Sequence, residues 1–202
     1  MGFPAFFGLA PRVMLRDPLA EFLGAADGPI EYGYVDAVRL AGHSCPTVAG
    51  AYLMARAALL GLYPNSPGER GGVAVTMRFP ESEGTTGVMA QVFTLLTGAA
   101  GANGFQGLGD RFARRGLLDY GIDQRTLARF RRLDNGVTVG VSLDLSRVPP
   151  VAGLRTLLGR AQAADATDAE RAAFGAAWQD RVRRLLLEYA DDPDVIRLER
   201  AS

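Results

Sequence analysis

The run from Thr47 to Tyr63, TVAGAYLMARAALLGLY, restricts the possible folds more than any other stretch. Val48, Tyr52 and Leu59 recur in it at helical spacing, which predicts an apolar α-helix. A helix of this kind needs a core to pack against, and 202 residues with 48% hydrophobic content are enough for one substantial core.

The chain's only histidine and only cysteine lie directly before this run, in Ala41-Gly42-His43-Ser44-Cys45-Pro46. Pro46 fits the first position of the helix, because the N–H that it lacks would find no partner there. A thiol at the first turn faces unpaired N–H groups and the positive end of the helix dipole, which favour a thiolate. A reactive centre is therefore expected at His43 and Cys45.

Composition excludes several functions. All 22 basic residues are arginine, so the chain has no lysine for a phosphate-binding loop or for a Schiff base, including that of pyridoxal-phosphate enzymes. One cysteine forms no internal disulfide, and one histidine excludes helical double-histidine zinc motifs. Because 22 acidic residues balance the charge, neither nucleic acid nor an anionic membrane is expected as a partner.

The apolar start of the chain does not predict a secretory signal, because no basic region precedes it and Pro4, Pro11 and Arg12 interrupt it. Arg56 and Gln91 interrupt the long apolar segments, so no membrane span is expected. We therefore expect a cytoplasmic protein.

Turn and periodicity signals predict strands and helices in one domain. Residues Val73–Phe79 alternate as a strand, and Asn135-Gly136 between two alternating runs, 127–133 and 137–143, predicts a hairpin. Residues Val88–Thr97, closed by Gly98, predict a buried helix. A short helix is expected to begin near Asp17-Pro18 and to end at Gly24 or Gly28. The glycine-rich passage 98–116 is expected to be an irregular loop, and the alternative is that it brings backbone N–H groups close to a ligand.

After Pro149-Pro150, residues 152–164 and 167–189 are predicted to be helical. Thr167 and Glu170 match a capping box, and an apolar stripe runs from Phe174 to Tyr189, so Trp178 should be largely inaccessible. The predicted fold class is α+β, with a mixed or antiparallel sheet packed with helices in a domain of residues 1–150. A C-terminal helical extension, residues 151–202, packs on this domain or on a partner.

With these segments in view, the chain resembles the FmdE-like family, which is named after a component of formylmethanofuran dehydrogenase, over residues 17–121. Members carry His-Gly-His-x-Cys-Pro at a helix start and, further along, a helix that ends in Thr-Gly before a glycine-rich stretch. The corresponding segments here are residues 41–46 and Thr97-Gly98 with the glycines that follow. Ala41 replaces the family's first histidine, and Val88 and Gln91 stand where its second helix commonly has cysteine and aspartate.

The resemblance implies an α+β homodimer with a divalent metal, Zn²⁺ by preference, held by His43 and Cys45. Solvent or a carboxylate would complete the metal site, and Glu83 is the candidate third ligand. Such a site is open, as catalysis or binding of a small-molecule ligand requires. Two other interpretations stay open. Cys45 could act as a nucleophile with His43 as its base, or the pair could ligate haem. Otherwise both residues are structural, and the protein is a non-catalytic dimeric accessory module.

Overall fold

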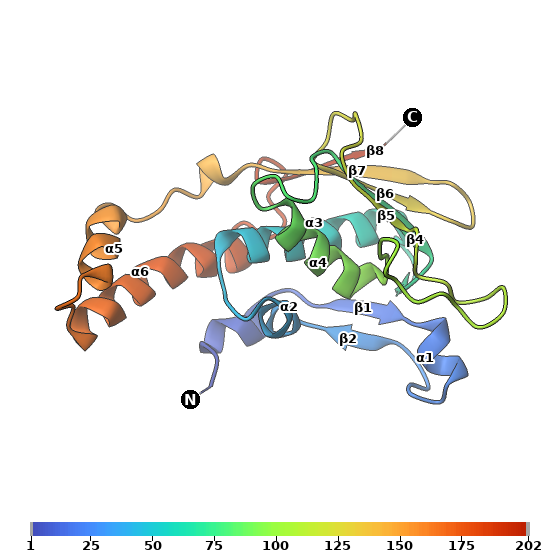
Figure 1. Cartoon of the computed structure of the whole chain (residues 1–202), viewed down its shortest axis with the longest axis horizontal. Helices are drawn as coiled ribbons and strands as arrows, with labels where there is room; N and C mark the ends of the chain where they lie inside the picture. The colour runs from blue at the N-terminus through green and yellow to red at the C-terminus, as the bar shows by residue number, and fades with distance from the viewer. Residues whose placement is uncertain (1, 201–202) are drawn as a thin grey trace.

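The computed structural model describes residues 2–200, in which two sheets enclose a central layer of helices (Figure 1). The predicted apolar helix is α3, Pro46–Leu62, and it contacts α4, α6 and the larger sheet. Because α3 is surrounded, almost its whole circumference is apolar, as is usual for a helix inside a core. The α+β fold class is confirmed.

The larger sheet has five strands in the order β5-β4-β6-β7-β8. The strands are β4 (Val73–Met77), β5 (Leu118–Asp119), β6 (Ala128–Arg132), β7 (Thr138–Leu143) and β8 (Ile196–Arg200). Neighbours run antiparallel except β4 and β5, which are parallel. The predicted hairpin is confirmed as β6 and β7, and Gly136 adopts a left-handed φ of 73° in its turn. Phe130 and Val139 face the helices and are fully buried.

The smaller sheet has the order β2-β1-β3, with β1 at Val13–Arg16, β2 at Ile30–Tyr32 and β3 at Gly68–Glu69. The 3₁₀-helix η1 (Ala5–Leu9) precedes it, α1 (Pro18–Phe22) connects β1 to β2, and α2 (Tyr34–Ala41) connects β2 to α3. The short helix α1 ends earlier than expected. The predicted second buried helix is α4, Thr86–Thr97, and it ends at Gly98 in a left-handed conformation.

The C-terminal helices form an arm beside this body (Figure 1). A 3₁₀ turn, η2 (Leu145–Arg147), leads to α5 (Leu154–Gln162) and α6 (Asp168–Leu187), and Thr167 and Glu170 form the predicted capping box. Trp178, expected to be largely inaccessible, is half-buried, and its indole N–H donates to the Ser44 carbonyl. Only Val182, Leu185 and Leu186 of α6 are buried, because the first half of α6 extends past the body. Strand β8, from the expected extension 151–202, then pairs with β7 of the expected domain 1–150. No helix within residues 2–200 is long and apolar enough to cross a membrane.

Candidate functional site

The loop between α2 and α3 holds His43 and Cys45 as the sequence predicts. Gly42 ends α2 with a φ of 74°, and Cys45 is the N-cap residue of α3, with Pro46 in the first turn. The half-buried Cys45 Sγ accepts a hydrogen bond from the Val48 N–H at 3.4 Å. The loop therefore gives the thiol the helix-start position expected for it.

His43 is exposed, and its Nδ1 lies 3.0 Å from the carbonyl oxygen of Ala41. Because a carbonyl oxygen only accepts, Nδ1 carries the proton of this hydrogen bond. No protein group among residues 2–200 bonds Nε2, so this nitrogen can accept from or ligate an external group.

Ser44, between the two, is fastened to the C-terminal arm. Its carbonyl oxygen accepts hydrogen bonds from Trp178 Nε1 and Gln179 Nε2, each at 3.1 Å. Its hydroxyl donates to Gln179 Oε1 at 2.9 Å and accepts from the Tyr34 hydroxyl at 2.8 Å. We call these contacts the Ser44 latch, and they hold the loop against α6.

The side chains of residues 2–200 do not form a complete metal site. Within residues 2–200, no group of three or more His, Cys, Asp or Glu side chains could hold a metal ion. Glu83 lies in the loop before α4, where its backbone N–H donates to Pro80 and its carbonyl accepts from Thr86. It does not join His43 and Cys45 in such a group. A resident metal would therefore need ligands from outside the chain.

A hollow of about 710 Å³ lies against α4. It is bounded by α4, the end of α2, the start of the glycine-rich passage and β5, and we call it the α4 hollow. Its lining mixes apolar and polar side chains with a short stretch of glycine-rich backbone: Leu40, Arg70, Glu81, Gln91, Thr94, Leu95, residues 100–103, Leu118, Asp119 and Tyr120.

Tyr120 and Glu81 meet at this hollow, with the tyrosine hydroxyl 3.5 Å from Glu81 Oε1. Burial, followed by the charge of Glu81, raises the pKa of Tyr120 above its ordinary value. The phenol therefore stays protonated and can donate to Glu81 or to a ligand.

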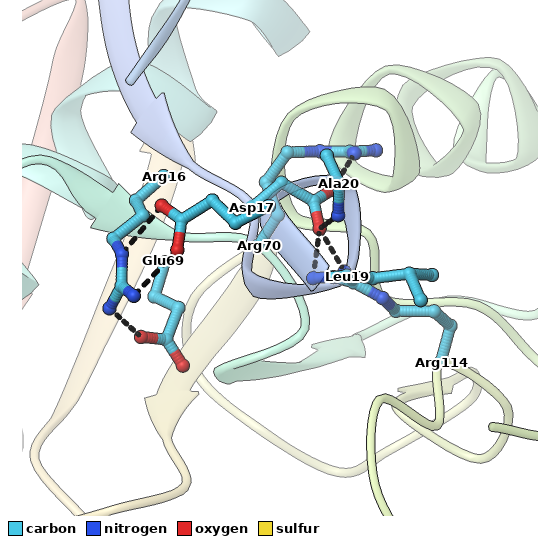
Figure 2. Close-up of polar contacts among 8 residues, drawn as sticks. Arg16, Asp17, Leu19, Ala20, Glu69, Arg70 and Arg114 are labelled. Carbon is cyan, nitrogen blue, oxygen red and sulfur yellow. Dashed lines mark hydrogen bonds and ion pairs between the residues drawn. The ribbon is translucent and has the colours of Figure 1, made fainter. Parts of the chain in front are cut away.

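Arg70 connects the hollow to a buried ionic cluster of Asp17, Arg70 and Arg114 (Figure 2). Asp17 accepts from Arg70 Nη1 at 2.5 Å and from Arg114 Nη2 at 2.7 Å. The same carboxylate caps α1 by accepting from the N–H groups of Leu19 and Ala20. Asp17 is only 5% exposed and Arg114 8%, so the cluster lies inside the protein.

The cluster shifts the pKa values of Asp17 and Arg114. Burial by itself would raise the pKa of Asp17, but Arg114, the Ala20 N–H and Arg70 outweigh burial and hold it below the ordinary value. Burial, together with repulsion from Arg70, lowers the pKa of Arg114 despite its contact with Asp17. The Asp17 carboxylate is therefore ionised at neutral pH.

Sequence reasoning missed this cluster, because Asp17 and Arg114 are 97 positions apart. The Asp17-Pro18 pair indicated only a helix start. A Cβ at Gly71 or Gly98 would lie 2.3 or 2.4 Å from Arg114 Nη1, so both glycines make room for this side chain. No pattern in the sequence connects these positions.

Neither a scan against protein-family models nor a search of curated proteins found a match for this chain.

Proposed function

We propose that this protein binds a small molecule in the α4 hollow. The observation that carries the proposal is the hollow itself, whose 710 Å³ falls in the range of about 300–1,000 Å³ usual for ligand sites. Its residues come from separate elements that the fold brings together.

The lining suits a ligand that is partly apolar. Leu40, Leu95 and Leu118 supply apolar surface, and Gln91 and Thr94 of α4 supply hydrogen-bonding groups. Residues 100–103 bring backbone close to the same space, which supports a binding role for the start of the glycine-rich passage.

A blocking substitution tests the proposal. Gln91 is exposed on α4 and lines the hollow, so Gln91→Trp should fill part of it without disturbing the core. Gln106→Trp is the matched control, since Gln106 is also exposed and lies outside the lining. In an NMR screen of anionic, cationic and neutral fragments, we expect shifts that map to the hollow in the wild type and in Gln106→Trp but not in Gln91→Trp. A screen without such shifts would contradict the proposal.

A second candidate function is binding of a divalent metal, Zn²⁺ by preference, by His43 and Cys45. The hydrogen bond from His43 Nδ1 to the Ala41 carbonyl favours it, because metal-ligating histidines commonly donate their other N–H to such a group. The resemblance to the FmdE-like family supports the same centre. Further ligands would come from solvent or from a second copy in a homodimer.

Metal stoichiometry tests this candidate. After expression with added zinc and dialysis against a weak chelator, His43→Ala and Cys45→Ser should lose most of the metal, whereas Glu83→Gln should not. Equal, near-zero content in all proteins would exclude a stable site. Light scattering that finds only a 21.5 kDa particle would exclude the homodimer.

A further inference from the structure

The Asp17 cluster carries more positive than negative charge. Two guanidinium groups, of Arg70 and Arg114, share the single carboxylate of Asp17. Neither arginine forms an ion pair with another carboxylate in residues 2–200; the neighbouring Glu69 lies 3.8 Å from Arg16, which Glu21 holds more closely, and its charge also acts on Arg114. The three bonded residues therefore carry one more positive than negative charge, which Glu69 offsets only from a distance and which an approaching anion would help to neutralise.

Donors in the cluster are also left unused. The Arg114 side chain is only 9% exposed, and its buried Nη1 has no hydrogen-bond partner within the described residues. Arg70 Nε is likewise enclosed and unpartnered. Buried polar groups are normally bonded, so two such nitrogens in one cluster require an explanation.

Arg70 brings this charge to the α4 hollow, whose wall it forms in part. Its Nη1 is bonded to Asp17 and its Nε is enclosed, whereas Nη2 is neither bonded within residues 2–200 nor enclosed. Nη2 is therefore the donor that a ligand can reach. Arg114, packed against the glycines at 71 and 98, does not line the hollow but shares the Asp17 carboxylate with Arg70.

We propose that the ligand of the α4 hollow is a small organic monocarboxylate whose carboxylate binds Arg70, an inference that rests on the proposed ligand-binding function. Glu81 and Asp119 also line the hollow, so its lining holds two carboxylates and one guanidinium group, and Glu81 accepts from the Tyr120 hydroxyl. These acids come from the side of the five-stranded sheet and disfavour a second negative charge on the ligand. The leucines of the lining suit an apolar body.

Four probes with six carbon atoms each test which ligand charge the hollow prefers: hexanoate, 6-aminohexanoate, hexanol and hexylamine. Each is titrated into the full chain and followed by NMR. Hexanoate should bind about tenfold more tightly than hexanol, because it adds a charge-assisted hydrogen bond. It should also bind more tightly than hexylamine. The 6-aminohexanoate probe should also bind more tightly than hexanol, since its carboxylate binds Arg70 and its ammonium group faces Glu81 and Asp119.

Arg70→Met should reduce hexanoate binding to the level of hexanol, while Asp17 and Arg114 remain as a balanced pair. Arg16→Met is the control, because Arg16 is next to Asp17 but does not line the hollow. Arg70→Lys keeps the positive charge and should still bind hexanoate more tightly than hexanol. This variant gives a second readout if Arg70→Met does not fold.

The outcomes separate the two proposals. Stronger binding of hexylamine, or unchanged hexanoate binding in Arg70→Met, would overturn the carboxylate inference and leave the ligand-binding function standing. Equal binding of hexanoate and hexanol would also overturn the carboxylate inference and leave the ligand-binding function standing. Failure of all four probes to shift resonances of the hollow would count against both.

Discussion

Asp17 concentrates several roles in one side chain. It caps α1, joins two arginines from distant parts of the chain, and stands behind one wall of the α4 hollow through Arg70. A buried carboxylate of this kind is tolerated only because several donors satisfy it at once.

Removing this charge should strongly destabilise the fold. Asp17→Asn keeps a capping residue for α1 but leaves Arg70 and Arg114 without a counter-charge, so we expect a loss of about 3–5 kcal/mol in the free energy of unfolding. Urea denaturation measures it. Asp27→Asn, at an exposed aspartate without an ion pair among residues 2–200, is the control and should change little. If Asp17→Asn lowers the free energy of unfolding no more than Asp27→Asn does, the proposed role of Asp17 is contradicted.

The same carboxylate predicts a pH dependence. Its folded-state pKa lies below the ordinary value of 3.8, so the unfolded chain takes up the proton first as pH falls. The stability that Asp17 contributes is therefore fully present above 3.8 and is lost as pH falls through the lower, folded-state pKa. The difference in unfolding free energy between wild type and Asp17→Asn should shrink over that range. A constant difference in urea titrations at successive pH values would be evidence against this linkage.

At the scale of elements, the arm and the loop before α3 depend on each other. Val182, Leu185 and Leu186 anchor the second half of α6. Preceding them in the helix, Trp178 and Gln179 form the Ser44 latch, which ties α6 to the loop with His43 and Cys45. Four hydrogen bonds converge on one serine, so the conformation of this loop is set by a helix more than a hundred positions away.

Breaking the latch should loosen the loop more than the fold. Trp178→Phe keeps an aromatic ring and removes one hydrogen bond, and Gln179→Ala removes two, so each should cost about 1–2 kcal/mol. Hydrogen exchange should become faster at residues 43–45 in both variants and stay unchanged in Gln162→Ala, at the end of α5. If exchange in the loop is unaffected by Gln179→Ala, the latch does not hold it.

On the scale of the whole molecule, β8 is the edge strand of the larger sheet next to β7. Strand β8 pairs with β7 along Val139–Leu143, Ile196 is 5% exposed, and Leu198 lies over Gly61 of α3. The end of the chain therefore covers an edge that would otherwise be open.

A chain that ends at Val195 should lose stability and self-associate. It loses the burial of Ile196, about 1.5–3 kcal/mol, and exposes the edge of β7 to pairing with other molecules. Thermal unfolding and light scattering measure both effects. Arg197→Ala keeps the strand and should leave both near wild type. A truncated chain that stays monomeric with an unchanged melting temperature would show that β8 is dispensable.

Elements with local sequence patterns could be predicted before folding is considered. The apolar run of α3, the Asn135-Gly136 turn and the capping box at Thr167 each depend on neighbours within a few positions, so periodicity and turn chemistry were sufficient to predict them. The position of Cys45 at a helix start was predictable for the same reason.

The contacts between these elements depend on the folded chain. The short strands β1, β3 and β5 have too few residues to show a period, and β8 forms because β7 offers an edge. The Asp17 cluster, the Ser44 latch and the α4 hollow join residues from separate segments, through contacts between side chains that no local pattern records. The first half of α6 has no fully buried residue although the apolar stripe begins there, because burial depends on what lies opposite a helix face, and only the folded chain sets that.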